Sequence, residues 1–297
     1  MENLSGNREW VRRLLGLESP ELLRPAAVRR CPLDPVGSIA LERVEVDTSD
    51  GDTVPCLLLS PEAPAGRTVI AVHQHAGKFS IGKSEVAGLC GDPSMAYGFR
   101  LAERGVRVLI PDLIGFEERQ RGWSPAGADD EQLDALMRIA QGSSLQAKHA
   151  KDIATLTTWL VEEPGMAGIL GIMGHSLGGQ VALFSLAFDA RLSVGVVSCG
   201  LGTVASFASH RIKHNPAWFV PGLEAAGDVP ALARALHGQK VLVTAGSADP
   251  WFPVIGVRAV LAGFGPGVCD THLFDGGHEL PAEMMELACS HFVDAIS

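Results

Sequence analysis

Gly-His-Ser-Leu-Gly-Gly at residues 174–179 places a serine between closely spaced glycines. The apolar run at residues 169–173 before it is typical of a buried strand, and residues 178–188 after it have a helical pattern. A serine at such a strand-to-helix turn adopts a strained backbone conformation that projects its hydroxyl, and the glycines let neighbouring backbone pass without a Cβ clash. The stretch therefore predicts that Ser176 is a nucleophile at the end of a strand.

Strand-like and helical patterns alternate on both sides of this turn. The other apolar runs that we interpret as buried strands lie at residues 68–72, 106–110, 194–198, 240–244 and 268–274. Helical patterns separate them at residues 93–104, 146–161, 254–262 and 281–295. Continuous apolar strands that alternate with helices indicate an α/β fold, in which a mostly parallel sheet carries helices on both faces. Residues 39–46 and 54–59, with a turn at Asp50-Gly51, predict an antiparallel edge at the amino-terminal side of the sheet.

The length of 297 residues suits one large α/β domain, so we expect a single domain over residues 1–297. Residues 1–37 are expected to form an N-terminal helical extension that becomes irregular where prolines recur. Two stretches, residues 116–145 and 201–239, do not fit the alternation of strands and helices. Both follow strand ends, where ligands bind in open α/β sheets, so we interpret them as inserts near the site.

A serine hydroxyl is a weak nucleophile at neutral pH and needs a base. His278 follows the last expected strand directly, so we interpret it as the general base. The acid that orients the imidazole is expected between the serine and the histidine, after another strand. Asp249 has that position behind the strand at residues 240–244, and Asp275 is the alternative that lies closer to His278 in the sequence.

Two backbone N–H groups are expected to bind the oxyanion that forms when the serine attacks. One is the N–H of Leu177, at the start of the helix. The second comes from the loop His73-Gln74-His75-Ala76-Gly77, where we assign the N–H of His75 and keep Gln74 as the alternative.

Bulky aromatic residues lie near the expected site. We expect the substrate pocket to be lined by Trp251 and Trp218, together with the polar Gln74. Trp123 and Phe219 add to the aromatic content of the two inserts. Together these aromatics predict a pocket that is closed on the acyl side, which favours esters of small acyl groups.

The sequence predicts neither a metal nor a cofactor. The six cysteines, at positions 31, 56, 90, 199, 269 and 289, have no CxxC or CxH spacing, which disfavours zinc and a dense disulfide framework. His73 and His75 face the same way if they lie on a strand, which is the basis of an alternative interpretation as a metal-dependent hydrolase. That interpretation requires further ligands at strand ends and leaves the serine turn without a role.

The overall composition narrows the classes of partner. The chain has 24 basic and 34 acidic residues, a net charge of −10 and no Lys/Arg run, and a nucleic-acid binder needs clustered cations. The longest apolar runs, such as residues 69–72 and 241–243, are strand-sized, and residues 1–15 lack the apolar core of a signal peptide. We therefore expect a cytoplasmic protein with a small-molecule substrate, no nucleic acid and no membrane; the sequence does not indicate an oligomeric state.

Several of these stretches together resemble a known branch of the α/β-hydrolase superfamily, the dienelactone hydrolase-like and acetyl xylan esterase-like proteins. The resemblance covers roughly residues 40–290 and rests on residues 73–77, 82–85, 111–112, 174–179, 249–253 and 276–278. It implies the α/β-hydrolase fold, a triad of Ser176, Asp249 and His278, no cofactor, and esters of small acyl groups as substrates. Dienelactone hydrolases proper have a cysteine nucleophile, so the serine in this chain favours a carboxylesterase.

The sequence as a whole predicts a serine hydrolase that cleaves a carboxylic ester through an acyl-enzyme. The same triad is able to cleave an amide, thioester or peptide bond, which is the closest alternative. A binding module with an inactive triad is a further alternative, although every triad position is filled in this chain.

Overall fold

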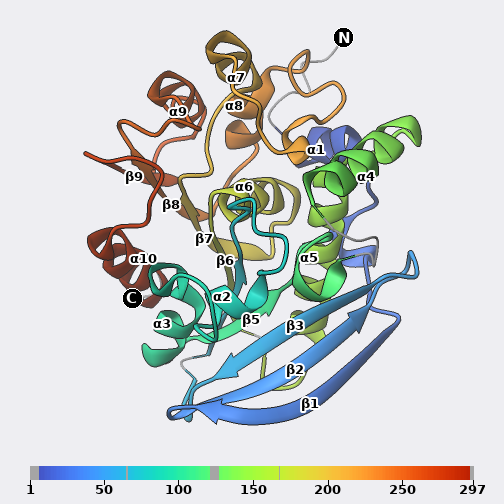
Figure 1. Ribbon diagram of the computed structural model, residues 1–297, viewed down its shortest axis with the longest axis vertical. Helices are drawn as coiled ribbons and strands as arrows, with labels where there is room; N and C mark the ends of the chain where they lie inside the picture. Colours follow the sequence, from blue (N-terminus) through green and yellow to red (C-terminus); the bar gives the residue numbers. More distant parts are fainter. Residues whose placement is uncertain (1–6, 65, 121–126, 167, 295–297) are drawn as a thin grey trace.

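The computed structural model describes residues 7–64, 66–120, 127–166 and 168–294. Within these ranges nine strands form one sheet, in the order β1-β2-β3-β5-β4-β6-β7-β8-β9 (Figure 1). Their bounds are β1 Ala27–Val36, β2 Ile39–Asp47, β3 Thr53–Ser60, β4 Arg67–Val72, β5 Arg107–Pro111, β6 Ile169–His175, β7 Leu192–Ser198, β8 Lys240–Gly246 and β9 Cys269–Phe274.

The pairing confirms a mostly parallel sheet with an antiparallel amino-terminal edge. β1, β2, β3 and β5 pair antiparallel in that order. β5, β4, β6, β7, β8 and β9 pair parallel. All the carboxyl ends of these six parallel strands therefore lie at one edge of the sheet.

Helices cover both faces of the sheet, as the sequence predicts (Figure 1). Side chains alternate along each strand, so Ile70 and Val72 of β4 face one core while Val69 and Ala71 face the other. The first core is closed by α1 Arg8–Leu15, α5 Leu145–Glu162, α6 Leu177–Phe188, α8 Asp228–Arg234 and α9 Val254–Leu261. The second is closed by α2 Lys83–Val86, α3 Tyr97–Glu103 and α10 Ala282–Asp294. Among the helices of the described residues, none has both the length and the apolar character that a membrane crossing requires.

The expectation of an N-terminal helical extension over residues 1–37 is wrong for its second half. After α1 and the short 3-10 helix η1 Pro20–Leu22, the chain forms the ten-residue edge strand β1. Pro32 and Pro35 suggested irregular structure, but an edge strand tolerates proline because one side of it needs no ladder donor. The register shifts between Leu33 and Val36, around Pro35, which is a bulge of the kind expected where a proline interrupts pairing.

Both inserts contain helices that the sequence patterns did not indicate. The stretch at residues 116–145 contains η3 Glu117–Arg119 and α4 Ala128–Ala140, and the stretch at residues 201–239 contains α7 Val204–His210, η4 Pro216–Trp218 and α8. Most of these helices have only three to seven residues, which is too short for a clear hydrophobic period.

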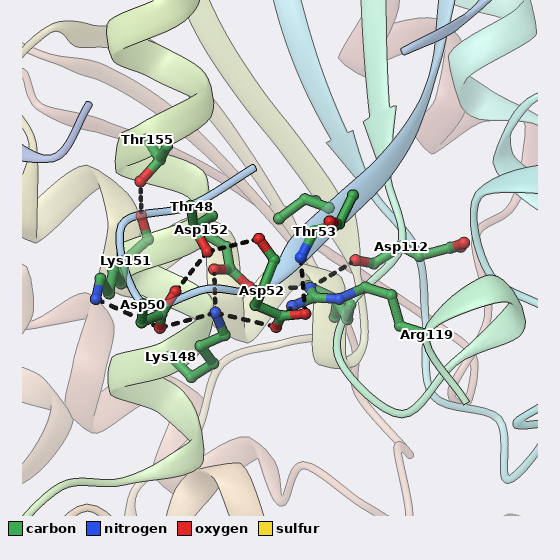
Figure 2. Close-up of polar contacts among 12 residues, drawn as sticks. Thr48, Asp50, Asp52, Thr53, Asp112, Arg119, Lys148, Lys151, Asp152 and Thr155 are labelled. Atoms are coloured by element: carbon green, nitrogen blue, oxygen red, sulfur yellow. Dashed lines mark hydrogen bonds and ion pairs between the residues drawn. The ribbon is translucent and has the colours of Figure 1, made fainter. Parts of the chain in front are cut away.

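A partly buried ion cluster joins the β2–β3 hairpin to α5 and to the segment after β5 (Figure 2). The Nζ of Lys148 lies 3.1 Å from carboxylate oxygens of both Asp50 and Asp52 in the hairpin, and 2.9 Å from Asp152 on its own helix. Arg119 donates to Asp152 at 2.9 Å and to the backbone oxygen of Asp112 at 3.0 Å. The cluster therefore fixes the chain just beyond the end of β5, next to the site edge of the sheet.

Candidate active site

Ser176 lies between the end of β6 and the first residue of α6, at the carboxyl edge of the sheet. Its φ of 57° and ψ of −119° are strained for a residue with a side chain. The turn is tight, because a Cβ on Gly178 would lie 1.9 Å from the backbone oxygen of Val72, and one on Gly174 would lie 2.1 Å from the backbone of Gly178. The glycines of the sequence motif are thus required by close approach of the backbone.

The structure brings the three predicted triad residues together. The Oγ of Ser176 lies 2.8 Å from Nε2 of His278, and Nδ1 of His278 lies 2.8 Å from Oδ2 of Asp249. A carboxylate oxygen only accepts, so Nδ1 carries the proton and Nε2 is free to accept the serine proton. The imidazole is therefore in the tautomer that a general base requires.

Asp249, and not Asp275, is in contact with the imidazole. Its carboxylate is 1% exposed, and its other oxygen, Oδ1, accepts the backbone N–H groups of Trp251 at 2.8 Å and Phe252 at 3.1 Å. Asp275 is exposed, and its carboxylate lies 3.4 Å from the hydroxyl of Ser247. The two backbone bonds orient Asp249 toward His278.

Aromatic rings surround the base. Phe252 stacks on His278 with ring centroids 5.5 Å apart, and His175 lies 5.0 Å from His278 on another side. Burial lowers the pKa of His175 to about 3, so this ring is neutral, and its Nδ1 lies 3.0 Å from the hydroxyl of Ser198. The surroundings of His278 are thus apolar or neutral apart from Asp249 itself.

His73 has a structural position in the loop after β4. Its Nε2 accepts the backbone N–H of Leu113 at 3.0 Å, and its Nδ1 donates to the backbone oxygen of Gln74 at 2.8 Å. Burial lowers the pKa of His73 to about 4, which keeps the ring neutral in this arrangement. Because both nitrogens are engaged with backbone, the geometry does not favour His73 and His75 as a pair of metal ligands.

The side chain of His75 connects the same loop to α4. Its Nδ1 accepts the backbone N–H of Gly77 at 3.0 Å, so its Nε2 carries the proton that is donated to Oε2 of Glu131 at 2.9 Å. Phe79 and Phe116 contact the ring from its sides, with centroids 5.1 Å and 5.2 Å away. These contacts fix a turn in which Ala76 has a φ of 45°, a region that non-glycine residues seldom adopt.

The residues expected to line the pocket have different positions. The amide of Gln74 donates to Glu85 of α2 at 3.0 Å. Trp251 is 49% exposed beside the acid, whereas Trp218 is fully buried among Phe184, Phe207 and Phe252. The structure therefore places Trp218 in the core and not on a surface open to substrate. Trp123 lies outside the described residues, and Phe219 is 48% exposed.

Comparison with known proteins gives structural matches only. No protein-family model matches the sequence, and no curated protein matches it. The chain is similar in structure to acetyl xylan esterase 1 from Thermoanaerobacterium sp. JW/SL YS485, with a TM-score of 0.69, 17% identity, and 97% of this chain and 93% of that chain covered. It is also similar to a putative acetyl xylan esterase from Bacteroides fragilis, with a TM-score of 0.70, 13% identity and coverage of 90% and 73%. The glucuronoyl esterase from Solibacter usitatus gives a TM-score of 0.65 at 14% identity, with coverage of 98% and 92%.

The chain has the α/β-hydrolase fold. In this fold the nucleophile, the acid and the base follow separate strands, and here Ser176, Asp249 and His278 follow β6, β8 and β9. The order along the chain is serine, aspartate, histidine, as the α/β-hydrolase fold requires.

The sequence analysis did not anticipate the positions of three residues at this site. They are Glu131, which binds His75; Phe252, which stacks on His278; and Cys199, which directly follows β7. Cys199 was the one with a usable signal, because a residue directly after a parallel strand lies at the site edge of the sheet. Glu131 had none, since nothing in the sequence pairs α4 with a loop 56 residues earlier.

Proposed function

We propose that this protein is a serine carboxylesterase that cleaves esters of small acyl groups through an acyl-enzyme. The observation that carries the proposal is the continuous hydrogen-bonded chain from Ser176 through His278 to Asp249, built on a strained strand-to-helix turn. The same constellation performs acyl transfer on unrelated folds.

In the first half-reaction the Oγ of Ser176 attacks the ester carbonyl carbon, and its proton passes to Nε2 of His278. The carbonyl electron pair moves to the oxygen, which becomes the oxyanion. When this intermediate collapses, the bond to the alcohol oxygen breaks, and the alcohol leaves with the proton from His278. In the second half-reaction water repeats these steps, and the carboxylic acid leaves. Asp249 stabilises the imidazolium throughout without taking a proton.

The oxyanion is proposed to lie between the N–H groups of Leu177 and His75. Leu177 is the first residue of α6, so its N–H is among those that have no acceptor within the helix. The positive end of the helix dipole also favours negative charge at this point. His75 belongs to the loop after β4, which pairs with β6 in the sheet, so the second donor approaches from the neighbouring strand.

The structural neighbours support an ester as the substrate, because the three proteins described above are named as esterases. Two of them are named for acetyl xylan and one for a glucuronoyl group, so an ester attached to a carbohydrate is a substrate class worth including in a screen. Amide, thioester and peptide bonds belong in the same screen, since the triad chemistry also applies to them.

The test is hydrolysis of p-nitrophenyl acetate by the wild type and by Ser176→Ala. The variant should lose kcat by a factor on the order of 10⁶, as removal of the nucleophile does in the template triad. It should also lose labelling by an organophosphate, while its circular dichroism spectrum stays native. Ser247→Ala, at an exposed serine near Asp275, is the matched control and should keep full activity. Labelling at another serine, or full activity of Ser176→Ala, would contradict the proposal.

A further inference from the structure

A cysteine lies against the acid and the base. Cys199 is fully buried, has a φ of 41°, and follows the end of β7 directly. Its Sγ donates to the backbone oxygen of Glu279 at 3.4 Å, in the segment that carries His278. One sulfur, one carboxylate oxygen and one ring nitrogen, from Cys199, Asp249 and His278, all lie within 4.8 Å of one another. Sulfur, nitrogen and carboxylate oxygen are the three ligand types of protein zinc sites.

The spacing of these atoms suits a tetrahedral ion after a small movement. Zinc binds sulfur at about 2.3 Å and nitrogen or oxygen at about 2.0–2.2 Å, so its ligand atoms lie roughly 3.3–3.8 Å apart. The Nδ1 of His278 and the Oδ2 of Asp249, now 2.8 Å apart, must therefore separate by about 0.5 Å. The side chain of His278 is 19% exposed whereas Asp249 and Cys199 are buried, so the ion has to enter past the imidazole ring.

We propose that zinc, or another thiophilic divalent cation, binds to Cys199, Asp249 and His278 and inhibits the enzyme. The inhibition rests on the proposed function, whereas the binding site itself rests on the three ligands alone. The ion is an inhibitor in this proposal, so the reaction described above proceeds without it.

The charges balance when the ion binds. Before binding, the group holds one negative charge, on Asp249, and burial together with that charge raises the pKa of the Cys199 thiol to about 12. When zinc binds, the thiol proton goes to solvent, and the thiolate and carboxylate neutralise the two positive charges.

Inhibition follows from the tautomer of His278. Zinc takes the lone pair of Nδ1, so the ring proton moves from Nδ1 to Nε2. An Nε2 that carries a proton donates to the Oγ of Ser176 and does not accept from it, so the base of the first step is lost. The nucleophile itself is not a ligand, and its replacement should not weaken the site.

A second group of carboxylates in the described residues does not compete for the ion. Asp112, Glu117 and Glu118 also bring ligand atoms within 4.8 Å of one another. The Nζ of Lys83 already lies 2.7 Å, 2.6 Å and 2.7 Å from their oxygens, and the lysine is 2% exposed. An ammonium group thus occupies the place that a cation would take.

The experiment titrates zinc chloride into chelator-treated enzyme during hydrolysis of p-nitrophenyl acetate. The wild type and Cys90→Ser, a control at an exposed thiol, should be inhibited equally. Relative to its own activity without zinc, Cys199→Ser should show an inhibition constant at least about tenfold higher, because even outer-shell partners of a zinc site change affinity by 10–100-fold. Cys199→Ala provides a second test if the serine variant fails to fold.

A second readout does not depend on ester hydrolysis. Calorimetry with zinc chloride should show one site in the Ser176→Ala variant, and the cobalt complex should show thiolate-to-metal charge-transfer absorption that Cys199→Ser lacks. Equal inhibition of the wild type and Cys199→Ser, or no binding to Ser176→Ala, would overturn the proposal. If the wild type hydrolyses no ester at all, the proposed function fails, and calorimetry still decides the metal site.

Discussion

The proposed triad and the proposed oxyanion loop, residues 73–77, lie at the same edge of the sheet but are held in different ways. Asp249 is oriented by backbone N–H groups two and three residues away, and Ser176 by the glycines of its own turn. The loop after β4 is held by distant groups: His73 by the backbone of Leu113, and His75 by a carboxylate on α4. Ser176 and Asp249 are thus oriented by their own turns, whereas the loop is held by contacts with distant segments.

This difference implies that the two halves of the site respond differently to substitution. Changes far from the triad should leave its geometry intact, because its own turns determine it. Changes on α4 should reach the oxyanion loop through the bond between Glu131 and His75.

The largest effect is expected when Asp249 of the proposed triad is replaced. Asp249→Asn should lower kcat by a factor on the order of 10⁴, because the amide no longer stabilises the imidazolium and favours the wrong tautomer. Asp275→Asn should change kcat far less, since Asp275 is exposed and contacts Ser247 instead of the imidazole. Steady-state kinetics on p-nitrophenyl acetate measure both. The opposite ranking of the two variants would show that Asp275 is the acid.

A smaller effect is expected when the loop is released from α4. Glu131→Ala should lower kcat by up to about 10²-fold with little change in KM, since removal of one oxyanion donor costs about 10²–10³ and acts in the transition state.

The matched variant for this test is Glu131→Gln, whose amide oxygen still accepts from Nε2 of His75 and should restore most of kcat. Asp129→Ala, on the same helix and exposed, should behave as the wild type. Equal losses in the alanine and glutamine variants would mean that the charge of Glu131, and not the position of His75, matters.

The length of the acyl chain that the enzyme accepts tests whether aromatic residues close the acyl side of the pocket. We expect kcat/KM for p-nitrophenyl esters to be highest from acetate to butyrate and to fall steeply beyond hexanoate. Each methylene that enters an apolar groove gains about 0.8 kcal/mol, and a closed wall replaces that gain with a clash. Trp251, which is 49% exposed beside Asp249, now carries this argument in place of the buried Trp218. A maximum at octanoate or longer would indicate an open cleft.

The smallest expected effect is the dependence of the free energy of unfolding on pH, and it involves histidines in both halves of the site. Burial lowers the pKa of His73 to about 4 and that of His175 to about 3, against 6.5 for an ordinary histidine. Between pH 6.5 and about 4 the unfolded chain therefore binds more protons than the folded one, so the free energy of unfolding falls as the pH falls. Burial raises the pKa of Asp112 to about 6, so protonation of this single carboxylate has the opposite effect on the free energy of unfolding. The buried His149 and the half-buried His214 and His291 also have lowered pKa values.

Thermal melts at pH 7 and pH 5 measure this dependence, and the melting temperature should be lower at pH 5. His175→Gln should reduce the difference, whereas His237→Gln, at an exposed histidine, should not. A higher melting temperature at pH 5 would contradict the assignment of neutral, buried rings.

The features that the sequence predicted are encoded locally, and those that it missed depend on tertiary contacts. The parallel strands, and the positions of Ser176, Asp249 and His278 at their ends, were predictable because a buried strand and the turn behind it are encoded within about ten residues. β1 was missed because its prolines are tolerated only at an edge, and which strand is the edge is a property of the whole sheet. The positions of Trp218 and Glu131 depend on how the inserts fold back, which short helices with weak periodicity do not reveal.

β1 also has a consequence for how the protein behaves at high concentration. It is a ten-residue outer strand, mostly exposed, and a free strand edge is a template on which other chains can assemble into larger aggregates. Two prolines remove donors from this edge, the register shift near Pro35 distorts it, and the charged side chains of Arg29 and Arg30 lie along it. The irregularity that concealed β1 in the sequence is thus the same property that keeps a long open edge from recruiting a second sheet.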